Sequence, residues 1–187
     1  MRRRRMLHAL KAARELGDYA EMPVLPADVD PQAHLSRNTV IQPFWLICSK
    51  DTVLVQMSGT AVIHLKDSSV NRFSTKIGDH VYIPAGTPHR IVPGKEGVQL
   101  RYKARTPGLE AIAWYCMGCD QELYRVDWDT AETVAQQGYY DACVEFNENE
   151  TLRSCADCGT TYPRIDMTPF SGWPEIAEQL RDEPATA

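Results

Sequence analysis

Short apolar runs separated by polar turn residues fill the middle of the chain, from Phe44 to Lys103. The runs are FWLIC, TVLVQM, TAVIHLK, RFSTKI, DHVYIP, HRIVP and VQLRYKA, and the breaks include SKD, SG, KDSS, GD, PAGTP and PGKEG. Short strands at close and regular intervals indicate an all-β sandwich or barrel. Long helical segments do not alternate with these runs, so the pattern argues against a doubly wound parallel sheet.

Helical signals lie towards the two ends of the chain. The residues on one face of a predicted N-terminal helix are Met6, Leu7, Leu10, Ala13 and Leu16, with Gly17 able to close it. Near the other end, Ser171 is suited to cap a helix whose apolar face carries Trp173, Ile176 and Leu180. We therefore expect an N-terminal helix and extended arm (1–43), a β-barrel (44–110) and a C-terminal arm with a closing helix (111–187).

Composition narrows the class of protein. With 187 residues, 43% of them hydrophobic, the chain suits one domain with a sizeable core. A net charge of −5 argues against a nucleic-acid partner. No apolar run is long enough for a membrane span, and Lys11, Arg14 and Glu15 interrupt any signal-peptide core, so we expect a cytoplasmic protein. The basic start Arg2–Arg5 is expected to be a solvated tail or sequence upstream of a start at Met6, with a weak phosphate-binding patch as the alternative.

Four of the six cysteines form two Cys-x2-Cys pairs separated by 35 residues. They are Cys116, Cys119, Cys155 and Cys158. Two intervening residues let both thiolates of a pair reach one tetrahedral ion, and four thiolates suit Zn²⁺ or a rubredoxin-like iron. A site with four protein ligands has no open position, so we expect it to be structural. Cys48 and Cys143 are expected to be small buried apolar residues.

The stretch GDHVYIPAGTPHRI carries a second motif, Gly78-x5-Pro84-x-Gly86-x2-His89. A strand, a tight turn and a histidine at the start of the next strand would present the imidazole to a barrel interior. This spacing resembles the second signature motif of the cupin superfamily. The fold class expected is therefore all-β, a small cupin barrel or jelly roll with an N-terminal helix and a four-cysteine arm.

Two further stretches narrow the resemblance, AWYCMGCDQELYRV and YYDACVEFNENETLRSCADCG. Together with the histidine motif they look like 3-hydroxyanthranilate 3,4-dioxygenase, in the form with a C-terminal rubredoxin-like four-cysteine site, over roughly residues 44–165. The resemblance implies a small aromatic acid as ligand, a nonheme Fe²⁺ held by two histidines and a glutamate, and a homodimer. The apolar stretch QPFWLIC is a candidate for the dimer contact.

Most of the iron triad implied by the resemblance has no match in this chain. Only His89 corresponds to a metal ligand; the position seven residues before Gly59, where the glutamate is expected, is Thr52, and the segment before it contains no histidine. The strand VQLRYKARTP, where the family has an acidic substrate-binding residue, offers only cations. Since one imidazole is too few ligands for oxygenase iron, we expect a barrel without the family's Fe(II).

Several roles then remain open for the residues around His89. His89 is the candidate catalytic residue, as an acid or base. The candidate substrate-binding residues are Arg101, Lys103, Arg105, Tyr82 and His64. His64 is also a candidate to share a metal with His89, and Asp51 is a further substitute ligand, whereas His34 is expected on the surface. We consider three functions: a divergent enzyme on an aminophenol or anthranilate-type acid or its ring-opened product, a non-catalytic ligand- or partner-binding pseudoenzyme, and an Fe(II) ring-cleaving dioxygenase with substitute ligands.

Overall fold

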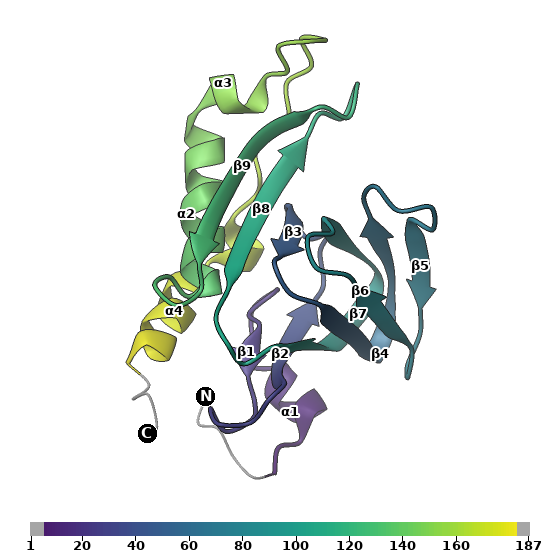
Figure 1. Cartoon of the computed structure of the whole chain (residues 1–187), viewed down its shortest axis with the longest axis vertical. Coiled ribbons are helices and arrows are strands. Elements are labelled where there is room, and N and C mark those ends of the chain that lie inside the picture. The colour runs from purple at the N-terminus through teal and green to yellow at the C-terminus, as the bar shows by residue number, and fades with distance from the viewer. Residues whose placement is uncertain (1–5, 183–187) are drawn as a thin grey trace.

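The computed structural model describes residues 6–182, so the basic start Arg2–Arg5 lies outside the described residues. Its strands are β1 (Met22–Pro23), β2 (Gln32–Asn38), β3 (Trp45–Cys48), β4 (Thr52–Leu65), β5 (Arg72–Thr75), β6 (His80–Ile83), β7 (His89–Lys103), β8 (Leu109–Tyr115) and β9 (Glu122–Asp129). All pair antiparallel in one sheet. The sheet follows the order β1-β2-β7-β3-β8-β9, while β4 pairs with β5, β6 and β7, and the whole curls into a half-barrel (Figure 1).

The long strand β7 organises the sheet. Its second half lies between β2 and β4, and its first residue pairs with both β3 and β4. This is possible because β4 bends through register shifts between Gln56 and Ala61. Gly59 lies in this bend with φ 69°, and a Cβ there would clash with the carbonyl oxygen of Glu96 on β7. Only glycine allows so close a contact between the two strands.

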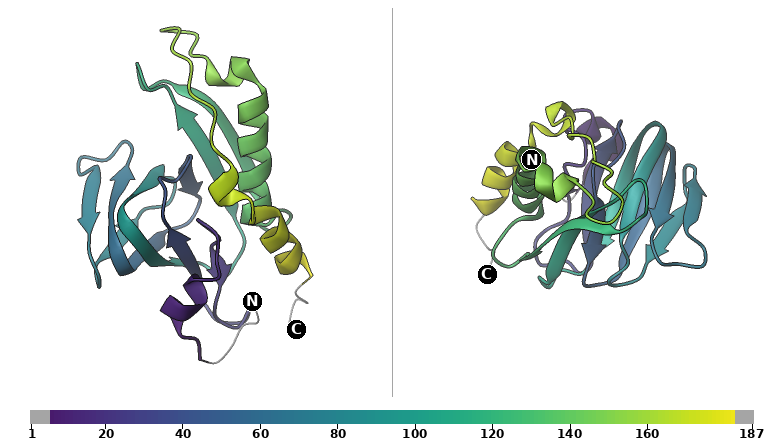
Figure 2. Two further views of the ribbon diagram at one scale, coloured as in Figure 1. Left: turned by 180° about the vertical axis from the view of Figure 1, so that it is seen from behind. Right: turned by 90° about the horizontal axis from the view of Figure 1, so that it is seen from above.

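The helices lie on two sides of the sheet. They are α1 (Ala9–Ala13), α2 (Ala135–Glu148), α3 (Glu150–Arg153) and α4 (Trp173–Arg181), with a 3-10 turn at Thr168–Phe170. Figures 1 and 2 show α2 running beside β8 and β9, with α4 beside it, while α1 lies at the other side near β2. Among residues 6–182, none of these helices is long and apolar enough to cross a membrane.

The main core lies between the inner face of the sheet and the layer formed by α2 and α4. The rings of Trp114 on β8 and Phe146 on α2 stack with centroids 4.2 Å apart and planes at 9°. Phe44 packs on Tyr139 of α2 at 4.9 Å, and Trp173 of α4 closes the cluster. Burying several aromatic side chains in one contact explains why the helices are held against the sheet.

The strand-rich curled sheet, the N-terminal helix and the C-terminal four-cysteine cluster confirm the predicted fold class. The N-terminal helix is shorter than expected: it begins after its N-cap residue His8 and ends at Ala13. Gly172, and not Ser171, is the N-cap residue of the closing helix. The stretch QPFWLIC contains β3, which is hydrogen-bonded on both edges and has most of its side chains buried within the chain, so it offers little free apolar surface. The division at residues 43 and 110 stays a prediction, although the described strands extend from Met22 to Asp129.

Candidate functional site

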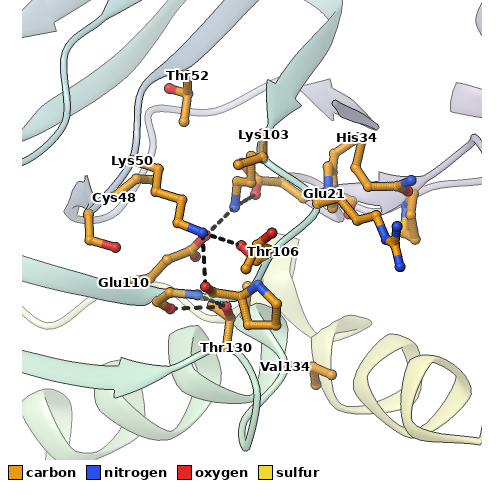
Figure 3. A pocket seen from close by; sticks show the side chains of 18 of the residues that line it. Glu21, His34, Cys48, Lys50, Thr52, Lys103, Thr106, Glu110, Thr130 and Val134 are labelled. Carbon is orange, nitrogen blue, oxygen red and sulfur yellow. Dashed lines mark hydrogen bonds and ion pairs between the residues drawn. The ribbon is translucent and has the colours of Figure 1, made fainter. Parts of the chain in front are cut away.

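A buried cluster of charged residues fills the inner end of the half-barrel. Arg101 of β7 donates from Nε to Oε1 of Glu21 at 2.8 Å. Lys103, two residues further along the same strand face, lies 3.0 Å from Oε2 of Glu21 and 2.8 Å from Oε1 of Glu110. Figure 3 shows the last of these contacts in the setting of the neighbouring cavity. Two cations and two carboxylates therefore balance one another, as buried charges must.

His89 belongs to the same cluster. Its Nε2 lies 2.6 Å from Nη1 of Arg101, and its Nδ1 lies 3.2 Å from the carbonyl oxygen of Thr87. Arginine can only donate and a carbonyl can only accept, so Nδ1 carries the proton and Nε2 accepts from the guanidinium. The imidazole is fully buried, and burial together with the Arg101 charge keeps the pKa of His89 well below its usual value. His89 is thus a neutral imidazole with both nitrogens engaged.

Glu21 reaches the cluster through an unusual backbone conformation. It precedes β1 with φ 45°, and Tyr19 has φ 52°, both in the left-handed region that non-glycine residues rarely adopt. The segment is held by Gln136 of α2, whose amide donates to the carbonyl oxygens of Ala20 and Glu21 at 2.6 and 3.2 Å. The hydroxyl of Tyr139 donates to Glu21 Oε2 at 3.2 Å. Such conformations cluster at functional sites, where the surrounding structure compensates for the strain.

The charges of the cluster stabilise one another. Burial alone would raise the pKa of Glu21, but the charges of Lys103 and Arg101 outweigh it and hold the pKa below its usual value. Burial alone would lower the pKa of Lys103, but Glu110 and Glu21 outweigh it and raise the pKa. At neutral pH, Glu21 is therefore a carboxylate and Lys103 an ammonium, and Lys103 is not a candidate for an uncharged amine nucleophile.

A cavity of about 310 Å³ opens beside this cluster (Figure 3). It lies between the start of β4, the end of β7, the start of β8 and the segment from Glu21 to His34. Its polar and ionisable lining side chains include those of Glu21, Gln32, His34, Cys48, Lys50, Thr52, Lys103 and Glu110. Its size falls at the lower end of small-molecule sites, which are roughly 300–1,000 Å³.

Three of the residues that line the cavity have buried polar atoms without a hydrogen-bond partner among the described residues. They are Oε1 of Gln32, Oγ1 of Thr52 and Oε2 of Glu110. Each residue is at least nine-tenths buried. A buried polar atom without a partner is unfavourable and rare, and these three atoms belong to residues that line one cavity.

The buried cysteine of the cavity is not activated. Burial, with a smaller contribution from Glu110, raises the pKa of Cys48 to about 12. Cys48 is therefore a thiol at neutral pH and not a nucleophilic thiolate. Cys143 lies on the buried face of α2, and burial raises its thiol pKa as well.

The family's barrel iron does not fit the residues present. Nε2 of His89, which a metal would need, is occupied by the positively charged Arg101, and Thr52 supplies only a hydroxyl. His64, the proposed second ligand, lies on the opposite face: Ile63 and Leu65 point inward with His89, whereas His64 pairs with Arg90 and contacts Trp45. Within residues 6–182, the four-cysteine cluster is the one group of three or more potential ligands close enough to share an ion.

The structure brings together only part of the predicted site. Arg101 and Lys103 lie in the charged cluster with His89, but His89 does not line the cavity and has no nitrogen free for acid–base chemistry. Arg105 is exposed at the rim of the cavity. Tyr82 is 56% exposed because its strand points it away from the inner face, so it lies outside the charged cluster, and its role in substrate binding stays a prediction.

Sequence reasoning missed three residues of the site. Glu21 and Glu110 supply the carboxylates, and His34, expected on the surface, lies on β2 opposite Arg101 and lines the cavity. The burial pattern of β2 does not alternate, so strand periodicity gives no signal for His34. Nothing local marks Glu21, because its position depends on contacts with β7 and α2.

The four predicted cysteines come together at the far end of the hairpin formed by β8 and β9. The Sγ atoms of Cys116 and Cys158 are 3.4 Å apart, and those of Cys119 and Cys155 are 3.5 Å apart. All four sulfurs lie within 4.8 Å of one another. Thiolates about 2.3 Å from a tetrahedral Zn²⁺ would be separated by roughly 3.8 Å, so the set fits one ion. Cys116 and Cys155 are buried, and Cys119 and Cys158 are exposed.

Comparison with curated proteins finds similarity to one named activity. A protein named 3-hydroxyanthranilate 3,4-dioxygenase from Bacillus cereus is 30% identical over 92 residues, which cover 48% of this chain and 50% of the relative. Proteins of the same name from Brucella anthropi and Shewanella woodyi are 30% and 27% identical, covering 63% and 68% of this chain and 66% and 68% of the relatives. The chain is a homologue of these dioxygenases. It nevertheless spans only about half the length of the curated relatives from Bacillus that it matches.

Other comparisons are less specific. No protein-family model matches the chain. Two similar solved structures are hydroquinone 1,2-dioxygenase PnpCD in complex with Cd²⁺ and 4-hydroxybenzonitrile, and a cupin-2 domain protein from Shewanella frigidimarina. They are 16% and 17% identical with TM-scores of 0.47 and 0.46, and cover 56% and 54% of this chain and 82% and 94% of those chains.

Proposed function

We propose that this chain is a divergent homologue of 3-hydroxyanthranilate 3,4-dioxygenase that acts on an aminophenol or anthranilate-type aromatic acid, or on its ring-opened product, without a barrel iron. One observation carries the proposal: the guanidinium of Arg101 lies 2.6 Å from the imidazole nitrogen that would otherwise face a metal. A cation at that position repels Fe²⁺ and removes the remaining ligand at once.

The cavity beside the cluster is the proposed substrate site. Lys103 is a fixed positive charge within it, and the amine of Lys50 lies at its edge, donating to the carbonyl oxygens of Thr106 and Pro107 at 2.7 and 3.0 Å. Arg105 at the rim could meet a carboxylate. The acid–base group would be Glu110, whose second oxygen has no hydrogen-bond partner within residues 6–182. His89 would have a positioning role, holding Arg101 and through it Glu21.

Metal analysis is the first test. Purified protein should contain about one metal per chain, and His89→Gln should leave that amount unchanged, because the metal is held by the four cysteines. We infer that this metal is zinc or iron in a structural role. Two metals per chain, with one lost in His89→Gln, would instead support an Fe(II) ring-cleaving dioxygenase with substitute ligands.

Turnover is the second test. Protein with one metal per chain should consume one member of a panel containing 3-hydroxyanthranilate, 2-aminophenol and anthranilate, measured by absorbance and mass spectrometry. A specific observation favours a non-catalytic alternative: His89 has both nitrogens engaged and Cys48 is a protonated thiol, which leaves few reactive groups. A panel member that raises the melting temperature without being consumed would establish that alternative.

A further inference from the structure

A row of basic side chains crosses the outer face of the half-barrel. His64 of β4 pairs with Arg72 of β5 on one side and with Arg90 of β7 on the other, so the imidazole lies between two arginines. Residues directly opposite one another on antiparallel strands have Cβ atoms about 4.5–5.5 Å apart. The three basic groups therefore occupy adjacent positions on one surface, and this surface faces away from His89.

No carboxylate balances this row within residues 6–182. The lysines and arginines that form ion pairs there are Arg37, Lys66, Arg101, Lys103, Arg125 and Arg153. Arg72 and Arg90 are not among them. Burial and the charges of these two arginines lower the pKa of His64, and no described carboxylate offsets them. Like charges on opposite residues are destabilising, so an uncompensated row on a chain of net charge −5 indicates a place for an anion.

The guanidinium of Arg90 is held in place by the backbone. Its Nε donates to the carbonyl oxygen of Gln42 at 2.7 Å, and the buried side chain of Gln42 accepts in turn from the N–H of Ile91 at 3.2 Å. The contact uses Nε alone, so the two terminal nitrogens of Arg90 have no partner among the described residues. A guanidinium oriented in this way is preorganised to donate two parallel hydrogen bonds to an oxyanion.

A groove of about 510 Å³ begins at Arg90 and extends along an aromatic wall. Its lining includes the side chains of Trp45, Tyr115 and Met117. The indole of Trp45 is partly exposed, and its ring centroid lies 6.4 Å from that of His64. An apolar or flat group attached to an anion on the basic row would therefore meet this indole.

Two guanidinium groups on either side of an imidazole suit a tetrahedral anion better than a planar one. A carboxylate has two oxygens and one charge, and a single guanidinium can satisfy both oxygens. A phosphate monoester has three terminal oxygens and a charge of about −1.5 to −2 at pH 7. It can therefore accept from both arginines and from the imidazole at once, while its fourth oxygen carries the organic group.

We propose that the outer face of the half-barrel binds a small phosphate monoester, with the phosphate held by Arg72, Arg90 and His64 and the organic group against Trp45. This site shares no lining residue with the cavity beside Glu21. The inference therefore goes beyond the proposed function and does not depend on what that cavity binds.

Matched probes test the charge and the number of oxygens. Binding of phenyl phosphate and of dimethyl phosphate is measured by isothermal titration calorimetry at pH 7.5 in a low-salt buffer free of phosphate. We expect phenyl phosphate to bind about tenfold or more tightly, because the diester has one charge and two free oxygens. Its affinity should also fall as salt is added, since the site is open to solvent.

Single substitutions place the phosphate on the surface. Arg72→Gln is the main variant, because Arg72 is exposed and its loss should leave the fold intact, as melting will check. It should weaken phenyl phosphate by about tenfold, through the loss of a charge-assisted hydrogen bond, and Arg90→Gln should weaken it at least as much. Arg125→Gln is the matched control. It removes the same charge from the same face of the sheet, but from an arginine paired with Asp127, and should leave the affinity within about twofold.

The outcomes are distinct from those for the cavity. Equal affinities in Arg72→Gln and Arg125→Gln, equal binding of the two phosphate probes, or no binding of phenyl phosphate each overturn the inference. So does binding of phenyl phosphate that benzoate displaces and that neither Arg72→Gln nor Arg90→Gln affects, because that ligand lies in the cavity. Binding lost in both arginine variants and kept in Arg125→Gln supports the inference, whatever the turnover assay shows.

Discussion

Replacing Arg101 by methionine should cost about 4 kcal/mol of unfolding free energy, because it breaks a buried ion pair from one side. The side chains of Arg101 and Glu21 are only 2% and 5% exposed, so the Glu21 carboxylate would remain in the interior with Lys103 alone. Removing one partner of a buried pair costs about 3–5 kcal/mol, and the loss of the donor to His89 adds about 1 kcal/mol. Methionine recovers part of the packing of the lost aliphatic stem. The expected net cost therefore stays at about 4 kcal/mol.

The assay is urea denaturation at pH 7.5 followed by circular dichroism, with unfolding free energies from linear extrapolation. Arg125→Met is the control, because Arg125 and Asp127 form a bidentate pair whose side chains are 40% and 46% exposed. An exposed pair of this kind contributes less than about 1 kcal/mol.

A double substitution tests the cause. Glu21→Leu combined with Arg101→Met should cost at least about 1 kcal/mol less than the sum of the single changes, because no charge of the pair is left without its partner. A cost for Arg101→Met no larger than that for Arg125→Met would refute the description of a tightly coupled buried cluster. So would strict additivity in the double variant.

Two further predictions concern the metal centre and the response to acid. Cys155→Ser should lose the bound metal and several kcal/mol of stability, whereas Cys143→Ala should keep its metal, as measured by mass spectrometry of metals and by melting; equal metal content in the two variants would contradict the assignment. His89 is neutral in the fold because its pKa is lowered, but its unfolded form takes up a proton below its usual pKa of 6.5, so stability should fall as pH drops from 6.5 towards 5. His89→Gln should reduce that slope by about 1.4 kcal/mol per pH unit, and an unchanged slope would count against a buried neutral imidazole.

The parts of the fold that sequence could predict are those with local signals. Alternating apolar runs gave the strands, and the Cys-x2-Cys spacing gave the metal centre because its ligands come in close pairs. The helix Ala135–Glu148 went unpredicted although Tyr139, Cys143 and Phe146 lie at helical spacing on its buried face. Its signal is weak because Gly138 and exposed polar residues interrupt the pattern.

The charged cluster could be predicted only in part, because its partners come from distant segments. Strand alternation puts Arg101 and Lys103 on one face, but it does not say which face, and the same ambiguity let us expect His64 beside His89, whereas it lies on the opposite face. The pairing register of β7 with β4 shows which face each of these side chains occupies. Glu21 is 80 residues from Arg101 in sequence, and its left-handed backbone is stabilised by contacts with α2 that no local pattern reveals.

The cluster also shows how side chains alone keep the charges of this interior balanced. A divalent ion in the interior needs ligands whose charge offsets it, and a guanidinium can provide positive charge there while forming directed hydrogen bonds of its own. Arg101 does this by donating to His89 and Glu21, and Lys103 and Glu110 complete a set with no net charge. Adding Fe²⁺ to that set would leave two positive charges unbalanced in a buried site. Restoring a metal would therefore require the removal of Arg101 and at least two new ligands, one of them at Thr52, so a single substitution at either position should not bind iron.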